Sequence, residues 1–153
     1  MHLQLLWVGK TKDRRIAELI SDYLQRLSKY AKYELKQLRE VKATDKRKVI
    51  EAEADLILDT IDLSSYKVVL DENGQQFTSE QFAATLEKLQ IRSVRELVFV
   101  VGGHFGLSER IREQADLLWS LSSLTLTHDM ARLLLAEQLY RGYTILNGHP
   151  YQK

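Results

Sequence analysis

The sequence predicts an α/β fold with a mostly parallel β-sheet and helices on both faces of the sheet. Short apolar runs typical of strands alternate with longer helical patterns from one end of the chain to the other. No linker, repeat or low-complexity segment interrupts this alternation, and the only proline is Pro150. We therefore expect one domain, residues 1–153, with one hydrophobic core.

In the first half of the chain two strands alternate with two helices. The first helix follows from one apolar face at i, i+3, i+4 spacing, made of Ile16, Leu19, Ile20, Tyr23, Leu24 and Leu27. The expected elements are strand Leu3–Val8, helix Asp13–Tyr30, strand Tyr33–Arg39 and helix Asp45–Ile61. The opening run "MHLQLLWV" lacks a preceding basic region and a small-residue cleavage pattern, so it is interpreted as a strand rather than a signal peptide.

The second half continues the alternation with three strands and three helices. Asn73-Gly74 is a turn signal just after the third strand. Ser79, followed by Glu80, is expected to begin the third helix. The expected elements are strand Lys67–Leu70, helix Ser79–Gln90, strand Leu97–Val101, helix Ser108–Ala115, strand Trp119–Leu124 and helix Asp129–Tyr143.

The composition excludes several classes of protein. The chain has no cysteine, so disulfides, thiolate metal sites and a cysteine nucleophile are excluded together, and we expect no metal. No apolar run approaches the ~20 residues that span a bilayer. We therefore expect a cytoplasmic protein with no membrane partner.

The charge is unevenly distributed although the net charge is only +1. The segment Lys10–Lys48 carries 13 basic and 6 acidic residues, whereas the remainder carries 9 basic and 15 acidic residues. A basic third of this kind favours binding to a nucleic-acid backbone. The alternative is a set of solvated helix faces that bind nothing specific.

Ligands of such sheets bind beyond the carboxyl ends of the strands, which selects three loops. They are "LDENG" (Leu70–Gly74), "GGHFG" (Gly102–Gly106) and "LSSLTLTHDM" (Leu121–Met130). The glycine spacing matches neither a dinucleotide fingerprint nor a phosphate loop, which leaves a plain strand-to-helix turn or a ligand loop of another kind. The third loop interleaves leucines with serines and threonines, which suits either a flat ring or a half-exposed terminal strand.

The last helix is apolar on nearly all sides. Its apolar residues are Met130, Leu133, Leu134, Leu135, Leu139, Tyr140 and Tyr143. One sheet covers a stripe only a little wider than ~100°, so a second surface must cover the rest. We expect that surface to be a second copy of the chain in a homodimer.

Three ordered motifs carry a resemblance to a known family. "FVVGGHFGLS", "WSLSSLTLTH" and "RLLLAEQLYRGYTILNGHPYQK", with "VVLDENG" upstream, resemble the RlmH (YbeA-like) family of SPOUT methyltransferases over the full length. The resemblance implies an S-adenosylmethionine-dependent enzyme that methylates N3 of a pseudouridine in 23S ribosomal RNA, with the large subunit or the ribosome as substrate. It also implies a homodimer and a C-terminal trefoil knot.

The resemblance also implies which residues contact the cofactor. The matching positions are Leu70, Gly102, Leu121, Ser122, Ser123, Leu124, Thr125 and Leu126. Two departures concern loop shape, because the family commonly has proline and glutamate where this chain has His104-Phe105, and proline where it has Thr127. A third is Gln152, which replaces a histidine of the family tail, so a proton-transfer role is not carried over.

For catalysis we expect His128 and Arg132, which lie four residues apart on one helix face. Alternatively, His128 makes only a local hydrogen bond at the helix start, and Arg132 forms only an ordinary ion pair. The expected RNA-binding residues are Arg14, Arg15, Lys46 and Arg47, with His149, Tyr151 and Lys153 in a tail that could instead be a frayed terminus.

Two other function classes remain open from the residues alone. A small-molecule α/β enzyme would use Asp71, Glu72 and His104 as its acid–base groups. A non-catalytic RNA-binding dimer would need the basic third of the chain and not the three loops.

Overall fold

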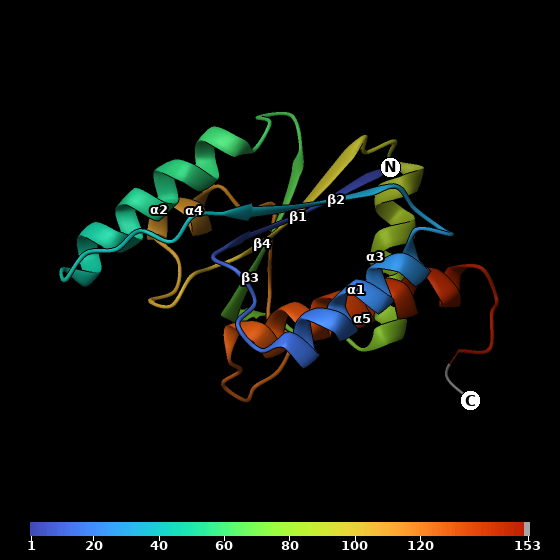
Figure 1. The fold of residues 1–153 in the computed structure, drawn as a ribbon. Helices are drawn as coiled ribbons and strands as arrows, with labels where there is room; N and C mark the ends of the chain where they lie inside the picture. Colours follow the sequence, from blue (N-terminus) through green and yellow to red (C-terminus); the bar gives the residue numbers. More distant parts are fainter. Residues whose placement is uncertain (152–153) are drawn as a thin grey trace.

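The computed structural model describes residues 1–151, which form a five-stranded, wholly parallel sheet in the order β2-β1-β4-β3-β5 (Figure 1). The strands are β1 His2–Val8, β2 Tyr33–Leu38, β3 Tyr66–Gln75, β4 Glu96–Val101 and β5 Leu117–Trp119. The helices are α1 Arg14–Leu27, α2 Lys46–Thr60, α3 Ser79–Ile91, α4 Glu109–Glu113 and α5 His128–Leu146. The predicted alternation of strands and helices is confirmed.

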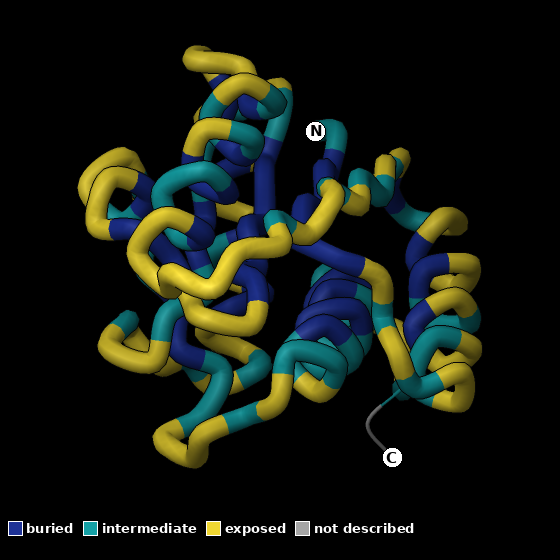
Figure 2. The backbone as a smooth tube through the Cα atoms, turned by 60° about the vertical axis from the view of Figure 1, so that its left-hand side comes forward, coloured by how far each residue is buried: buried dark blue, intermediate teal, exposed yellow. Residues whose placement is uncertain are grey.

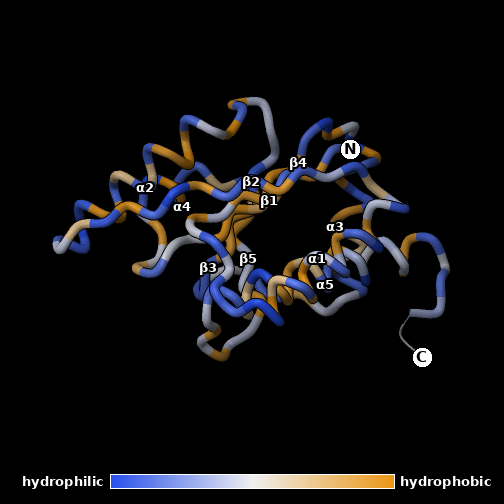
Figure 3. The backbone as a smooth tube through the Cα atoms, viewed as in Figure 1, coloured by the Kyte–Doolittle hydropathy of each residue, from blue (hydrophilic) through white to orange (hydrophobic). Residues whose placement is uncertain are grey.

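Helices cover both faces of the sheet, also as predicted. Along β1 the side chains alternate: Leu3, Leu5 and Trp7 pack with α1, α3 and α5, whereas Leu6 and Val8 pack with α2 and α4. The buried strands run through the middle of the molecule in Figure 2, and they are the most hydrophobic segments in Figure 3. In a parallel sheet every helix starts on the side where the strands end, which gathers the loops that follow β3, β4 and β5.

Side chains at the helix starts explain where the helices begin. The Asp13 carboxylate accepts hydrogen bonds from the N–H groups of Arg15 and Ile16 and so caps α1. Thr78 caps α3 in a reciprocal capping box with Gln81. Thr127, one of the departures from the family pattern, caps α5 by accepting a hydrogen bond from the Met130 N–H at 3.3 Å.

The predicted fifth strand, Trp119–Leu124, is wrong beyond Trp119, where β5 ends. The chain then bends, because the Ser120 hydroxyl donates to the Ser122 carbonyl at 2.9 Å and the Ser122 hydroxyl accepts from the Leu124 N–H at 3.0 Å. Serine hydroxyls that bond nearby backbone groups compete with strand pairing. Residues 120–127 therefore form a loop.

The third strand is longer than predicted. It runs on to Gln75 with an irregular register against β5, and the Asn73-Gly74 turn signal lies within that irregular part. A Cβ on Gly74 would lie 2.6 Å from the backbone nitrogen of Trp119, so glycine permits the close approach of β3 and β5.

Part of the apolar surface of α5 is buried in the chain's own core. Leu135, Leu139 and Tyr143 are 0–3% exposed and pack with the sheet, α1 and α3. Met130 remains 38% exposed, and Leu133 and Leu134 are half-buried. Within residues 1–151, no helix combines the length and the apolar character needed to cross a membrane.

Candidate functional site

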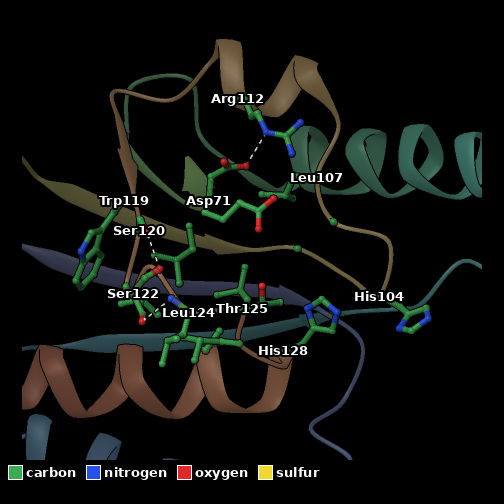
Figure 4. A pocket seen from close by; sticks show the side chains of 18 residues that line it. Asp71, His104, Leu107, Arg112, Trp119, Ser120, Ser122, Leu124, Thr125 and His128 are labelled. Atoms are coloured by element: carbon green, nitrogen blue, oxygen red, sulfur yellow. Dashed lines mark hydrogen bonds and ion pairs between the residues drawn. The ribbon is translucent and has the colours of Figure 1, made fainter. Parts of the chain in front are cut away.

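A cavity of about 400 Å³ opens at the carboxyl end of the sheet, between the loops that follow β3, β4 and β5 (Figure 4). Seven of the eight predicted cofactor residues line it: Leu70, Gly102, Leu121, Ser122, Leu124, Thr125 and Leu126. Ser123 does not line the cavity. Loops that are more than 50 residues apart in the sequence thus form one small-molecule-sized pocket. A volume of roughly 300–1,000 Å³ is usual for such sites.

The glycine loop turns sharply beside this cavity. The Gly106 N–H donates a hydrogen bond to the Gly103 carbonyl at 3.0 Å, and Gly106 has a φ of +86°, which favours glycine. A Cβ on Gly102 would lie 2.8 Å from Leu107 Cγ and 3.1 Å from the carbonyl carbon of Gly106. Gly102 therefore lets the loop fold back on itself, and it also lines the cavity, where the resemblance implies that it contacts the cofactor.

A buried carboxyl group lies against the glycine loop at Gly103. Glu53 of α2 is 4% exposed, and its Oε1 accepts a hydrogen bond from the Val41 N–H at 3.3 Å. Its Oε2 has no hydrogen-bond partner and occupies the space where a Cβ of Gly103 would be. Burial raises the pKa of this carboxyl group, which the Val41 hydrogen bond only partly opposes.

The sequence analysis missed Glu53, although a signal was present. Glu53 lies four residues from both Val49 and Ile57, which are buried on the inner face of α2. An acidic residue at an inward position of an amphipathic helix indicates a specific buried partner.

Replacing Gly103 by alanine is expected to lower the free energy of unfolding by about 1–3 kcal/mol, as overpacked sites do. The new Cβ would lie 2.5 Å from Glu53 Oε2, so the buried Glu53 carboxyl group, the loop or α2 must shift. Denaturant unfolding measures the change. In a Glu53→Ala background the same substitution should cost much less, and an equal cost in both backgrounds would contradict the contact.

Asp71 and Arg112 form an ion pair on the wall of the cavity, drawn with a dashed line in Figure 4. Arg112 Nε lies 2.6 Å from an oxygen of Asp71, whose side chain is 6% exposed. Burial raises the pKa of Asp71, but hydrogen bonds from Arg112 and the Asn73 N–H outweigh it and hold this pKa below its ordinary value. Asp71 therefore stays ionised at neutral pH and is unsuited to donate a proton.

Two histidines lie at one side of the cavity, where Figure 4 shows both rings. His128 is the first residue of α5, and its ring centroid lies 6.2 Å from that of His104 in the glycine loop. Burial, and then the charge of Arg132, lower the pKa of His128 below 6.5. The ring is therefore neutral at pH 7 and has one nitrogen free to accept a proton or a hydrogen bond.

Arg132 does not line the cavity, although its spacing from His128 predicts a shared face. Its guanidinium donates hydrogen bonds to the Val8 carbonyl at 2.5 Å and to Thr11 Oγ1 at 3.3 Å, and lies 5.4 Å from the centre of the Trp7 ring. It is 2% exposed. These contacts tie α5 to the end of β1, so Arg132 holds the loop after β1 in place.

The predicted RNA-binding residues lie at two helix starts and in the tail. Arg14 pairs with Glu18 and Arg15 with Asp13 at the start of α1. Lys46 and Arg47 are the first two residues of α2, which packs on the opposite face of the sheet from α1. The Lys46 amino group lies 5.9 Å from the Phe105 ring centre. Both helix starts lie toward the cavity edge of the sheet.

The tail folds away from the cavity of its own chain. His149 Nδ1 lies 2.5 Å from the Tyr30 hydroxyl, and the Tyr151 hydroxyl lies 3.3 Å from Tyr23 and from Glu137. His128 and Ala131 at the start of α5 line the cavity. The tail follows the other end of this helix (Figure 1), about 28 Å away for 19 residues. Gln152 and Lys153 lie outside the described residues.

The cavity contains no set of metal ligands. Among residues 1–151, no three histidine, aspartate or glutamate side chains are grouped closely enough to hold a metal ion.

The chain is similar to known methyltransferases along its whole length. Residues 1–152 match the family model described as predicted SPOUT methyltransferase. Curated relatives named ribosomal RNA large subunit methyltransferase H are 40% identical in Christiangramia forsetii and 39% identical in Gloeobacter violaceus, covering 99% of this chain and 98% of each relative. One from Streptococcus gordonii is 37% identical over the full length of both chains.

A solved structure shares the fold at low sequence identity. A probable methylase family protein from Haemophilus influenzae aligns with a TM-score of 0.53 and 11% identity, covering 99% of this chain and 70% of that chain.

Proposed function

The chain belongs to the SPOUT methyltransferase family, and we propose on this basis that it methylates the ribosomal RNA of the large subunit with S-adenosylmethionine as methyl donor. The observation that carries the proposal is the cavity that the loops after β3, β4 and β5 enclose. The names of the curated relatives support the RNA substrate. A match over residues 1–152 supports one catalytic domain, which would act in the cytoplasm on ribosomes.

The residues of the cavity fit this methyl donor. Leu70, Leu121 and Leu126 offer apolar surface for an adenine ring, and the glycine loop and residues 120–127, which border the cavity, would offer backbone N–H and carbonyl groups for its edge. Leu124 lines the cavity and is 74% exposed, so it would become more buried when the ring binds. The bound cofactor supplies a sulfonium methyl group that an RNA nitrogen attacks.

For the reaction itself we assign proton transfer to His128. The proposed target, N3 of a pseudouridine, carries a proton that must leave before the lone pair can attack. His128 borders the cavity and is neutral at pH 7, so it suits the role of acceptor. The rest of the rate enhancement comes from positioning, because the enzyme holds the attacking nitrogen in line with the methyl group.

Replacing His128 by asparagine is expected to lower kcat by about 10²–10⁴-fold, the usual contribution of a proton-transfer group. In the unchanged enzyme kcat should fall at acidic pH, because His128 then gains a proton and can no longer accept one. Since the pKa of His128 is lowered, this fall should come at a lower pH than for an ordinary histidine. The variant should lose this acidic limb. A pH–rate profile of the variant that matches the wild type would remove His128 from the mechanism.

We also propose a homodimer through the apolar surface that α1 and α5 leave exposed. Leu19 is 48% exposed and Met130 38% exposed, and the two helices pack side by side (Figure 1). Because the tail lies about 28 Å from its own cavity, the His149–Lys153 tail of one chain would serve the cavity of the other. We further propose the C-terminal trefoil knot that the family resemblance implies.

Calorimetry with S-adenosylmethionine tests the proposed cofactor. The described cavity should bind one molecule per chain, and a small-molecule enzyme of another class or a non-catalytic RNA-binding protein should bind none. The same titration with ATP is the control for nonspecific binding of adenine. The absence of binding to S-adenosylmethionine, or equal binding to ATP, would contradict the cofactor assignment.

A further inference from the structure

The tip of the glycine loop presents two rings to solvent. The hydrogen bond from the Gly106 N–H to the Gly103 carbonyl closes a four-residue turn, whose two central residues are His104 and Phe105. Their ring centroids lie 4.9 Å apart. Phe105 is 37% exposed, and His104 beside it is also exposed.

The two rings connect the cavity to a basic helix start. His104 lines the cavity and faces His128 across 6.2 Å. On the other side, the Lys46 amino group lies 5.9 Å from the centre of the Phe105 ring. Neither Lys46 nor its neighbour Arg47 forms a salt bridge with any residue of the range 1–151. Aromatic surface and unpaired positive charge thus lie next to each other at the cavity mouth.

We propose that His104 and Phe105 form an aromatic platform on which an unpaired base of the RNA substrate stacks, while Lys46 and Arg47 contact the adjoining phosphates. The proposal rests on the proposed function, because it names how the same site holds its substrate. Single-stranded RNA bases stack on aromatic side chains, and a neighbouring cation adds attraction to the phosphate backbone.

The geometry also indicates which base stacks. A base that is methylated in the cavity must leave its place among its neighbours, which breaks the stack on either side of it. The adjacent base then has one exposed face. Rings at the cavity mouth lie where that face emerges, so the platform would compensate for the lost stacking of the base next to the target.

The test compares Phe105→Leu, which keeps an apolar side chain of similar size without a ring, with Phe105→Tyr, which keeps the ring. Methyl transfer to ribosomes and calorimetry with S-adenosylmethionine are measured for each. Phe105→Leu is expected to raise KM for ribosomes about 5- to 100-fold, the range for the loss of one base–aromatic stack, with little change in cofactor affinity. Phe105→Tyr should have a KM for ribosomes near the wild-type value, because it keeps the aromatic ring.

The salt dependence of KM separates stacking from charge. Phe105→Leu should leave its slope unchanged, because no counterions are involved, whereas Lys46→Gln should make the slope shallower. Leu63→Ala, at a residue 88% exposed and away from the cavity, is the control for a generic loss of surface apolar area.

Three results would overturn the platform. The first is a KM for Phe105→Leu equal to that of the wild type. The second is a defect of Phe105→Leu in cofactor affinity rather than in KM for ribosomes. The third is a KM for Phe105→Tyr raised as much as that of Phe105→Leu. Failure of the proposed function has a different signature, since the wild-type protein itself would then transfer no methyl group to ribosomes.

Discussion

Gly102→Val is expected to weaken S-adenosylmethionine binding by about 10- to 100-fold and to reduce methyl transfer at least as much. Even a Cβ at this position would lie 2.8 Å from Leu107 Cγ, and the two further methyl groups of valine crowd the turn at Gly106. Overpacking of this kind costs about 1–3 kcal/mol, and we expect the loop to relieve it by shifting toward the cavity.

Calorimetry measures the affinity, and circular dichroism with thermal unfolding checks that the variant is folded. Gly102→Ala should show a smaller loss, because a single Cβ crowds mainly the Leu107 side chain, with the Gly106 carbonyl carbon 3.1 Å away. The double variant Gly102→Ala/Leu107→Ala should recover part of the affinity, since the Leu107 atoms nearest to the new Cβ are gone. Unchanged affinity in a folded Gly102→Val protein would mean that the glycine loop does not border the cofactor.

Introducing a charge into the exposed apolar surface of α1 and α5 is expected to give monomers. Leu19→Glu and Met130→Glu each place a carboxylate at the proposed interface, where an unpaired buried charge is costly. If the tail of the partner positions the RNA, kcat/KM should fall by about 10²-fold or more, because small misplacements cost that much. Sedimentation measures the association state.

Ile91→Glu is the matched control, because Ile91 is an apolar residue, 76% exposed, at the end of α3 rather than on the proposed interface. Leu135→Glu would not test the interface. Leu135 is 0% exposed in the core of its own chain, so a charge there should unfold the protein. Intact dimers in both Leu19→Glu and Met130→Glu would refute the placement of the interface.

Periodicity and the carboxyl-edge rule predicted much of this molecule. The i, i+3, i+4 pattern of α1 and the short apolar runs of β1 and β4 are strong local signals, because both elements bury a continuous apolar surface. The position of the cavity followed from strand topology alone. Both predictions depend on patterns within one element or on a general property of parallel sheets.

Predictions that needed to know which residues meet across the fold were less successful. Residues 120–124 have the composition of a strand, but the hydroxyls of Ser120 and Ser122 bond the local backbone instead. Arg132 shares a helix side with His128, yet its long side chain reaches Val8 on β1. Glu53 and Arg112 went unnoticed because their partners, Gly103 and Asp71, lie about 40–50 positions away in sequence.

The most direct measurement incubates the purified protein and labelled S-adenosylmethionine with ribosomes from cells that lack this enzyme, and then identifies the methylated nucleoside by mass spectrometry. The account predicts one methyl group per large subunit, on N3 of a pseudouridine in the large ribosomal RNA, and a sharp loss of labelling with His128→Asn. Labelling confined to another RNA or to protein, or none at all from a protein that binds the cofactor, would contradict it.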